Sequence, residues 1–220
     1  MKITVVGSTG QTGYHVVRLA LKAGHEVQAL LRNPAKMPLK HQRLTVIKGN
    51  VLSETFLATN FADQDVVISC LNTHPGLCVK ITLYTDSIEV ITGAMRQAGV
   101  KRLITMTSWC TGSDPKDPGP FLMEYILKPL FMKIILENMT CMEEYLMKEC
   151  HDIIYTIVRP PRVVKDRTSG KELISQERFH VKEACSTIPN VDVAKFMVSC
   201  AETSTWESKA VAIGVPWKII

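Results

Sequence analysis

Three glycines near the start of the chain have the spacing of a phosphate-binding turn. Gly7, Gly10 and Gly13 follow an apolar run at residues 2–6 in the pattern G-x-x-G-x-x-G, and an apolar helical pattern begins after Gly10. Gly7 can take the tight turn that leaves a strand, Gly10 lets the backbone approach phosphates, and Gly13 lets the helix pack closely on the sheet. Strand, turn and helix together predict a dinucleotide pyrophosphate site; the alternative is a glycine-rich turn without a ligand.

The first turn of the predicted helix supplies hydrogen-bond donors to such an anion. The backbone N–H groups of Gln11 and Thr12 have no partner within the helix, and they carry the positive end of the helix dipole. The hydroxyls of Ser8, Thr9 and Thr12 are further candidate donors. These residues form the phosphate-binding part of the predicted site.

A positive charge ends the second predicted strand. An enzyme that prefers NAD usually carries Asp or Glu at this place, which accepts hydrogen bonds from the ribose 2′-hydroxyl. This chain has Arg32 there, and the planar guanidinium favours a 2′-phosphate and can also stack on adenine. Lys36 could add a second positive charge, so the pattern indicates NADPH/NADP+; the alternative is a solvated charge at a strand end.

Asn50 and Val51 follow the third predicted strand. The Asn50 amide could bond the edge of adenine while Val51 packs on the ring. The alternative is that Asn50 is a turn residue, because Gly-Asn is a common turn dipeptide.

Ser108 follows the predicted strand at 102–107, within reach of a bound nicotinamide, where reductases of this fold often use a serine to bond a substrate oxygen. Their usual proton donor is the tyrosine of a Y-x-x-x-K pattern, which Tyr125 and Lys128 do not meet. A simple ketone needs a proton for the forming alkoxide. A flavin, quinone or tetrapyrrole instead spreads the charge over a conjugated system. We therefore expect Ser108 to act on a flat conjugated acceptor.

Apolar β-branched runs alternate with helical patterns, which predicts an α/β fold with a doubly wound, mostly parallel Rossmann sheet in a single domain, 1–220. Expected strands cover residues 2–6, 26–31, 44–48, 65–71, 102–107, 153–158 and 210–215. Expected helices cover residues 11–23, 53–58, 79–98, a region ending near 150, and 192–201. Residues 109–140 and 159–190 are expected to form loops or a lid on the substrate side.

In such a sheet the ligand lies at the carboxyl ends of the strands. After the fourth predicted strand come Leu71, Asn72 and Thr73, which we expect at the cofactor. His74 in the same loop could contact phosphate or substrate; the alternative is an exposed histidine. The other histidines have no metal-like spacing with one another, so no metal site is predicted.

Composition and charge exclude several classes of protein. Apolar residues make up 46% of the chain and charged residues 21%, which excludes a disordered chain. The net charge of +5 comes without a basic run, so we expect no nucleic-acid partner. The longest apolar stretch, 121–136, is broken by charges and a proline, so we expect no membrane span. The seven cysteines are scattered and never spaced as C-x-x-C, which indicates reduced thiols in a cytoplasmic protein.

The motifs together resemble those of the atypical short-chain dehydrogenase/reductase family, and within it the NADPH-dependent flavin and biliverdin-IXβ reductases. The resemblance covers nearly the whole chain, and it is carried by Gly7–Gly13, Leu30–Pro34, Lys48–Leu52, the pair Thr107-Ser108, and Arg159-Pro-Pro161.

The resemblance implies a monomeric NADPH enzyme that reduces flavins, open tetrapyrroles or quinones. It places the cofactor contacts on Gly7, Thr9, Gly10, Gln11, Thr12, Arg32, Lys36, Asn50, Val51, Leu71, Thr73 and Ser108. Trp109, His74 and Arg162 are then expected beside the substrate. The competing hypothesis is a protein that binds NADP(H) as a redox sensor, turns nothing over and governs a protein partner. An isomerase or lyase of sugar nucleotides fits less well, since such enzymes usually keep the tyrosine-lysine pair.

Overall fold

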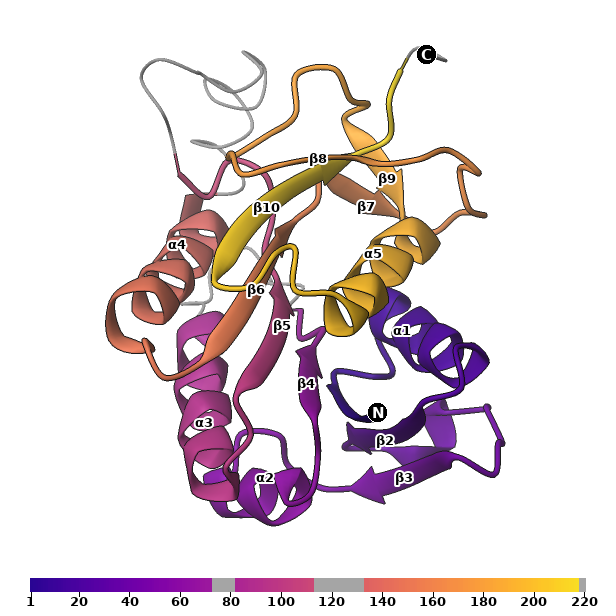
Figure 1. Ribbon diagram of the computed structural model, residues 1–220, viewed down its shortest axis with the longest axis vertical. Helices are drawn as coiled ribbons and strands as arrows, with labels where there is room; N and C mark the ends of the chain where they lie inside the picture. The colour runs from indigo at the N-terminus through magenta and orange to yellow at the C-terminus, as the bar shows by residue number, and fades with distance from the viewer. Residues whose placement is uncertain (73–81, 113–132, 218–220) are drawn as a thin grey trace.

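The computed structural model describes residues 1–72, 82–112 and 133–217 and gives an α/β arrangement of ten strands and five α-helices within those ranges (Figure 1). The strands are β1 (Lys2–Val6), β2 (Glu26–Leu31), β3 (Leu44–Lys48), β4 (Val66–Ser69), β5 (Arg102–Met106), β6 (Ile154–Arg159), β7 (Arg162–Val164), β8 (Ile174–Gln176), β9 (Thr187–Pro189) and β10 (Lys209–Gly214). The helices are α1 (Gln11–Lys22), α2 (Glu54–Phe61), α3 (Leu83–Ala98), α4 (Lys133–Glu149) and α5 (Asn190–Glu202), with a short 3₁₀ turn, η1 (Pro34–Lys36).

Eight of these strands form one sheet in the order β3-β2-β1-β4-β5-β6-β10-β8, while β7 and β9 pair separately. All neighbours in the large sheet run parallel except β10 and β8, which are antiparallel. The chain runs outward from β1 to β3 on one side and returns to β4 on the other. The strand order therefore reverses between β1 and β4, which is where ligands bind in doubly wound sheets.

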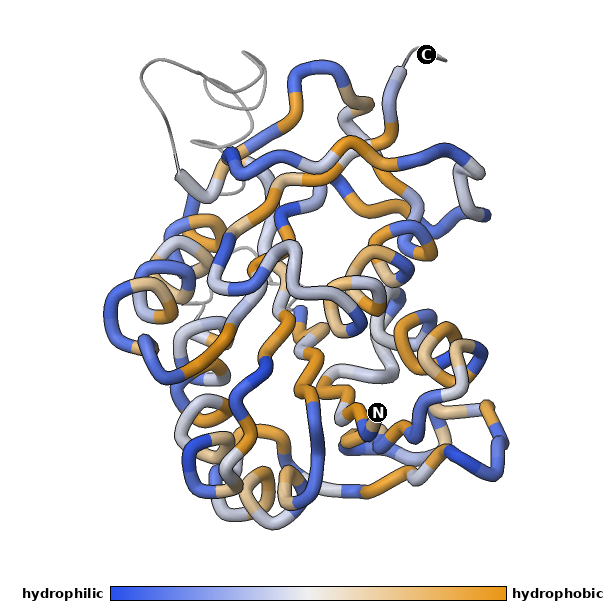
Figure 2. The backbone as a smooth tube through the Cα atoms, in the orientation of Figure 1, coloured by the Kyte–Doolittle hydropathy of each residue, from blue (hydrophilic) through white to orange (hydrophobic). Residues whose placement is uncertain are grey.

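The central strands are buried on both faces, and their side chains alternate between two cores. Ile3 and Val5 of β1 pack in the core shared with α1 and α5, whereas Val6 packs in the core shared with α2, α3 and α4. Figure 1 shows these two groups of helices on opposite sides of the sheet. The colouring in Figure 2 is mostly hydrophobic along the central strands and hydrophilic in the outer turns. This two-sided burial explains the continuous apolar runs in the sequence.

Helix boundaries follow local signals in the sequence. Ser53 caps α2, with its hydroxyl accepting a hydrogen bond from the Phe56 N–H at 3.4 Å. α3 ends at Gly99, whose φ of 75° lies in the left-handed region that glycine adopts without steric cost. None of the helices in the described ranges has the length and apolar character needed to cross a membrane.

The predicted fold class is confirmed, and two details differ from the prediction. β4 is shorter than the expected strand at 65–71, because the backbone leaves the sheet after Ser69. The segment 159–190, expected as loops, contains β7, β8 and β9, each three residues long. Strands this short carry too few residues for an alternating pattern to be recognised. Of the other expected loop region, 109–140, residues 113–132 lie outside the described ranges.

Candidate active site

A cleft of about 440 Å³ opens at the carboxyl ends of the central strands, where the strand order reverses between β1 and β4. It is lined by Gly7, Thr9, Gly10, Gln11, Thr12, Leu30, Leu31, Arg32, Lys36, Val51, Cys70, Leu71, Asn72, Met106 and Val163. Ten of these are residues that the sequence predicted for a cofactor site. A larger hollow of about 730 Å³ lies at the amino ends of the strands, around Met1, Asp65 and Gly99. That hollow lies where α1 and α3 end and includes no helix N-terminus, so we place the functional site in the first cleft, at the carboxyl ends of the strands.

The glycine turn at the base of the cleft requires glycine for two steric reasons. Gly7 has a φ of 77°, and a Cβ built there would lie 2.7 Å from the carbonyl carbon of Cys70. A Cβ on Gly13 would lie 2.3 Å from the carbonyl oxygen of Gly7. The first turn of α1 therefore packs directly on the turn that leaves β1, and both approaches are too close for any side chain.

The N-terminus of α1 presents uncapped backbone N–H groups to the cleft. Gly10 is the N-cap, no side chain caps the helix, and its first turn has no acidic residue. The N–H groups of Gln11 and Thr12 thus remain available for an anion. Asn190 at the start of α5 donates from Nδ2 to the carbonyl oxygen of Gln11 at 3.1 Å, which ties this turn to the neighbouring helix.

Ser8 differs from its predicted role as a donor to the anion. The residue is fully buried, and its hydroxyl donates to the carbonyl oxygen of Leu30 at 3.5 Å. Thr9 and Thr12 line the cleft, so these two of the three predicted residues remain candidate donors to an anion.

Two cations border the cleft beyond the end of β2. Arg32 and Lys36 are exposed and line the cleft, and neither forms an ion pair with another residue in the described ranges. Asn33 caps η1, its side-chain oxygen accepting a hydrogen bond from the Ala35 N–H at 3.1 Å. This turn brings Lys36 back beside Arg32, which gives a positively charged pocket suited to a phosphate.

The loop after β3 contributes one of its two predicted residues to the cleft wall. Val51 is 8% exposed and lines the cleft. Asn50 turns its side-chain oxygen to the N–H of Leu52 at 3.1 Å, which is the turn role that the sequence left open. Val51 follows β3, the neighbour of the β2 strand that Arg32 follows, and its apolar side chain could pack on a flat ring.

The loop after β4 forms the opposite part of the wall. Leu71 and Asn72 line the cleft with Cys70. Burial raises the pKa of the Cys70 thiol to about 12, so this sulfur stays protonated and unreactive. Thr73 and His74, predicted for cofactor and substrate, lie outside the described residues.

The residues after β5 divide between the cleft and the core. Met106 lines the cleft, and Ser108 is half-buried with no hydrogen-bond partner for its hydroxyl among the described residues. Trp109 is 4% exposed, and its indole N–H donates to the carbonyl oxygen of Ile213 at 3.1 Å. The indole therefore packs among Val181, Ala184 and Ala212 rather than lining the cleft.

A buried polar network behind Ser108 was missed from the sequence. Glu143 of α4 and Arg159 of β6 form an ion pair, with Oε2 and Nη2 2.5 Å apart and side chains 4% and 6% exposed. Thr107 donates to Glu143 Oε1 at 2.6 Å, and Thr111 lies 3.0 Å from both carboxylate oxygens. The guanidinium also donates to the Arg178 carbonyl and lies 4.4 Å from the ring centroid of Phe179. The network fixes the backbone on both sides of Ser108.

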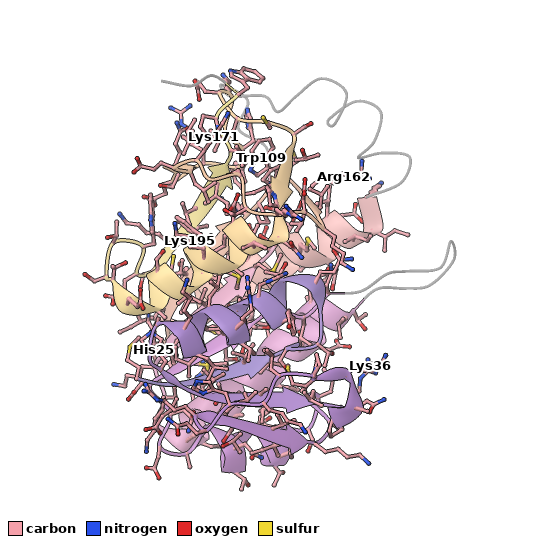
Figure 3. The ribbon with its side chains drawn as sticks, turned by 90° about the vertical axis from the view of Figure 1, so that its right-hand side faces the viewer. His25, Lys36, Trp109, Arg162, Lys171 and Lys195 are labelled. Atoms are coloured by element: carbon pink, nitrogen blue, oxygen red, sulfur yellow. The ribbon has the colours of Figure 1, made fainter. Side chains whose placement is uncertain are left out.

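Arg162 begins β7, and its neighbour Val163 lines the cleft. The Arg162 side chain is exposed, and its backbone N–H donates to the Ser186 carbonyl at 3.2 Å. Figure 3 shows Arg162 and Lys36 on the same side of the molecule, whereas His25 lies on the other. Arg162 thus belongs to the side on which Lys36 borders the cleft. Val163 lies in the segment after a predicted strand where a ligand was expected, and the structure places it in the cleft wall.

A protein-family model described as NAD(P)H-binding matches residues 7–204. The chain belongs to this NAD(P)H-binding family. NADPH/NADP+ is accordingly its cofactor, as the sequence predicted, and the roles of Gly7, Arg32 and Lys36 in binding it stay predictions.

Relatives of this NAD(P)H-binding protein include reductases. The chain is 29% identical to the photosystem II assembly factor Ycf39 of Synechocystis over 54% of this chain and 37% of that protein. It is 23% identical to the divinyl chlorophyllide a 8-vinyl-reductase of Arabidopsis thaliana, over 100% of this chain and 54% of the reductase. The chain thus spans between about a third and two thirds of the length of the first curated relatives it matches.

Solved structures share the fold at low identity. The anaerobillin reductase ChuY of Escherichia coli O157:H7 superposes with a TM-score of 0.78 at 19% identity, covering 100% of both chains. The oxidoreductase ylbE of Lactococcus lactis gives a TM-score of 0.78 at 18% identity, over 97% of this chain and 90% of that one. These likenesses establish the Rossmann-like fold of the NAD(P)H-binding family in this chain.

The residues of the cleft fit an NADP(H) molecule. The turn at Gly7 and Gly13 leaves no room for a side chain, the N-terminus of α1 is uncapped, and two cations border one end. Pyrophosphate, a 2′-phosphate and two flat rings thereby find complementary groups within one cleft.

Proposed function

We propose that this protein is an NADPH-dependent reductase that transfers a hydride to a flat conjugated acceptor, such as a flavin, a biliverdin-type tetrapyrrole or a quinone. One observation carries the proposal. Glu143 is the acidic residue of α4 that lies beside Thr107 and so next to Ser108, and it is held in an ion pair with Arg159. That acid is thereby taken up by the protein itself. An acceptor that spreads negative charge over a conjugated system and takes its proton from water does not need that donor.

The Glu143 carboxylate is surrounded by hydrogen-bond donors of the protein itself. Its two oxygens accept hydrogen bonds from Thr107, Thr111 and Arg159, so the carboxylate is fully used in holding the loop around Ser108. Tyr145, the tyrosine of α4, lies with its hydroxyl 3.2 Å from Thr92 Oγ1, on the side of α3. Neither Glu143 nor Tyr145 of α4 is therefore free to serve a substrate at Ser108 as the acid.

The cofactor roles in this proposal follow the walls of the cleft. The glycine turn with Thr9, Gln11 and Thr12 binds the pyrophosphate, and Arg32 with Lys36 binds the 2′-phosphate. Val51, with Asn50 at its side, packs on the adenine ring. Leu71, Asn72 and Thr73 hold the nicotinamide half.

The acceptor side of the proposal begins at the nicotinamide end. When bound, the cofactor supplies the hydride. Ser108 donates a hydrogen bond to an oxygen or nitrogen of the acceptor, where negative charge develops. Arg162 and His74 attract an acidic group of the acceptor. Trp109, anchored in the core through the Ile213 carbonyl, supports the loop after β5 that carries Ser108. Met106 and Val163 give the apolar surface that a flat ring needs.

The relatives support a reductase more than any other class of enzyme. Two proteins that this chain resembles carry the names divinyl chlorophyllide a 8-vinyl-reductase and anaerobillin reductase. The expectation of a monomer in the cytoplasm stays a prediction.

The test is NADPH oxidation by the purified protein, followed by absorbance, with FMN, biliverdin and a simple quinone offered in parallel and NADH as the cofactor control. We expect acceptor-dependent loss of NADPH. Tight NADPH binding without turnover on any acceptor would instead favour the redox sensor that governs a protein partner.

A further inference from the structure

We propose that Tyr84 is a positioning residue for the cofactor, which fixes the amide of Asn72 so that its NH₂ group faces the dinucleotide. The inference rests on the placement of the cofactor in the cleft given under the proposed function. It concerns two residues of α3 and α4, Tyr84 and Asn138, that no sequence pattern indicated.

The first observation is a hydrogen bond between a buried tyrosine and a residue of the cleft wall. Tyr84, in the first turn of α3, is 2% exposed. Its hydroxyl donates to Asn72 Oδ1 at 2.8 Å. Asn72 lines the cleft beside Leu71 and Cys70, so the phenol reaches the wall from behind.

The direction of this bond determines what Asn72 offers to a ligand. A side-chain amide has an oxygen that accepts and a nitrogen that donates, and the two lie on opposite sides of the group. Because the oxygen is turned to Tyr84, the two N–H donors of Asn72 are left for the cleft. No other side-chain hydrogen bond of Asn72 occurs within the described ranges.

The second observation is that Tyr84 is itself held in place from α4. Thr82, the N-cap of α3, makes no side-chain capping bond. Asn138 of α4 takes that role, since its Oδ1 accepts from the Tyr84 backbone N–H at 3.0 Å. Asn138 Nδ2 also donates to Thr85 Oγ1 at 2.9 Å. A chain of hydrogen bonds thus runs from α4 through the start of α3 to the cleft.

The position of Asn72 indicates which part of the cofactor it meets. In the sheet, β4 lies between β1, which carries the glycine turn, and β5, which carries Met106. Arg32 lies on the other side of β1, at the end of β2. Asn72 therefore stands between the pyrophosphate and the nicotinamide, where the ribose hydroxyls of the nicotinamide half offer oxygen acceptors to its N–H groups.

The test compares binding of NADP+ with binding of adenosine 2′,5′-bisphosphate, which lacks the nicotinamide half, by calorimetric titration. Tyr84→Phe should weaken NADP+ binding about three- to tenfold and leave the fragment unchanged, since one hydrogen bond is lost at the nicotinamide half only. Tyr145→Phe is the matched control, because it removes a tyrosine hydroxyl between α4 and α3 that does not reach the cleft. This control should bind both ligands as the natural protein does.

Two further variants test the direction of the Asn72 amide. Asn72→Asp puts an acceptor where the proposal needs a donor, so it should bind NADP+ more weakly than Asn72→Ala does. In the Asn72→Ala background, Tyr84→Phe should have no further effect on NADP+ affinity. The proposal is overturned if Tyr84→Phe weakens NADP+ and the fragment equally, or if its effect persists in that background. These measurements need no turnover, so they stand even if no acceptor is ever reduced.

Discussion

Glu143 and Arg159 are joined by a hydrogen-bonded ion pair inside the protein, although one lies on a helix and the other at the end of a strand 16 positions later. The guanidinium and both threonine hydroxyls fill the hydrogen-bonding capacity of the carboxylate. Burying the two charges costs desolvation free energy, and the hydrogen bonds of the pair with each other and with the threonines offset it. Here it holds the loop from Thr107 to Thr111, which carries Ser108.

Removing the charge of Glu143 should destabilise the fold. Glu143→Gln keeps the shape of the side chain but leaves Arg159 buried without a counter-charge. We expect the free energy of unfolding to fall by about 3–5 kcal/mol. Urea denaturation measures it. Glu144→Gln breaks the exposed pair with Lys148 on the same helix and should leave the unfolding midpoint unchanged. If both variants lost a similar free energy of unfolding, the burial of Glu143 would not account for its contribution to stability.

Arg32 should select the phosphorylated cofactor. Arg32→Ala removes the guanidinium from the 2′-phosphate, so we expect NADPH affinity to fall about tenfold to a hundredfold while NADH affinity changes little. Fluorescence titration with each cofactor gives both values. Arg18→Ala removes an equal charge from the exposed side of α1 and controls for the overall charge of the protein. Equal losses for NADPH and NADH would contradict the 2′-phosphate argument.

Ser108 should affect turnover more than cofactor binding. Ser108→Ala removes the hydroxyl that meets developing charge on the acceptor, so we expect kcat to fall about tenfold to a hundredfold. The Kd for NADPH should stay within about twofold of its original value, because the glycine turn and the two cations are intact. Ser199→Ala, whose hydroxyl bonds the Phe196 carbonyl within α5, is the matched control for loss of a half-buried serine hydroxyl. Unchanged turnover in Ser108→Ala would remove the catalytic role.

Two buried thiols should make stability depend on pH in the alkaline range. Burial raises the pKa of Cys70 to about 12, and burial raises that of Cys200 to about 12 against the opposing effect of Arg102. In the unfolded chain a thiol loses its proton from about pH 9, while the folded protein keeps it. The stability due to these thiols is therefore complete below about pH 9, and it is lost as pH rises towards 12.

In that pH window, each thiol should lower the free energy of unfolding by at most about 1.4 kcal/mol per pH unit. Urea unfolding at several pH values, in the natural protein and in Cys70→Ala and Cys200→Ala, measures the slope. Each variant should lose part of it, whereas Cys141→Ala, at an exposed thiol, should keep it. A slope that none of these substitutions alters would assign the effect to other groups.

The sequence by itself was enough for the fold class and for ten of the residues that line the cleft. Continuous apolar runs marked the central strands, because a parallel sheet covered on both faces needs apolar side chains on both. The glycine turn was recognisable because its residues are neighbours in the chain and glycine is sterically required at Gly7 and Gly13. Arg32 and Lys36 were recognisable for the same reason, because both come within a few positions of the end of β2 in the chain.

Only the tertiary structure decided which distant side chains meet. Asn190 reaches the carbonyl of Gln11 across 179 positions, and Tyr84 reaches Asn72 only because α3 packs beside the end of β4. Trp109 follows a strand as a substrate residue would, yet its indole bonds Ile213 in the core. Such contacts depend on the crossover of each helix and on the order of strands in the sheet. A local pattern in the sequence records neither, because it reflects which residues are buried and not which residues they are buried against.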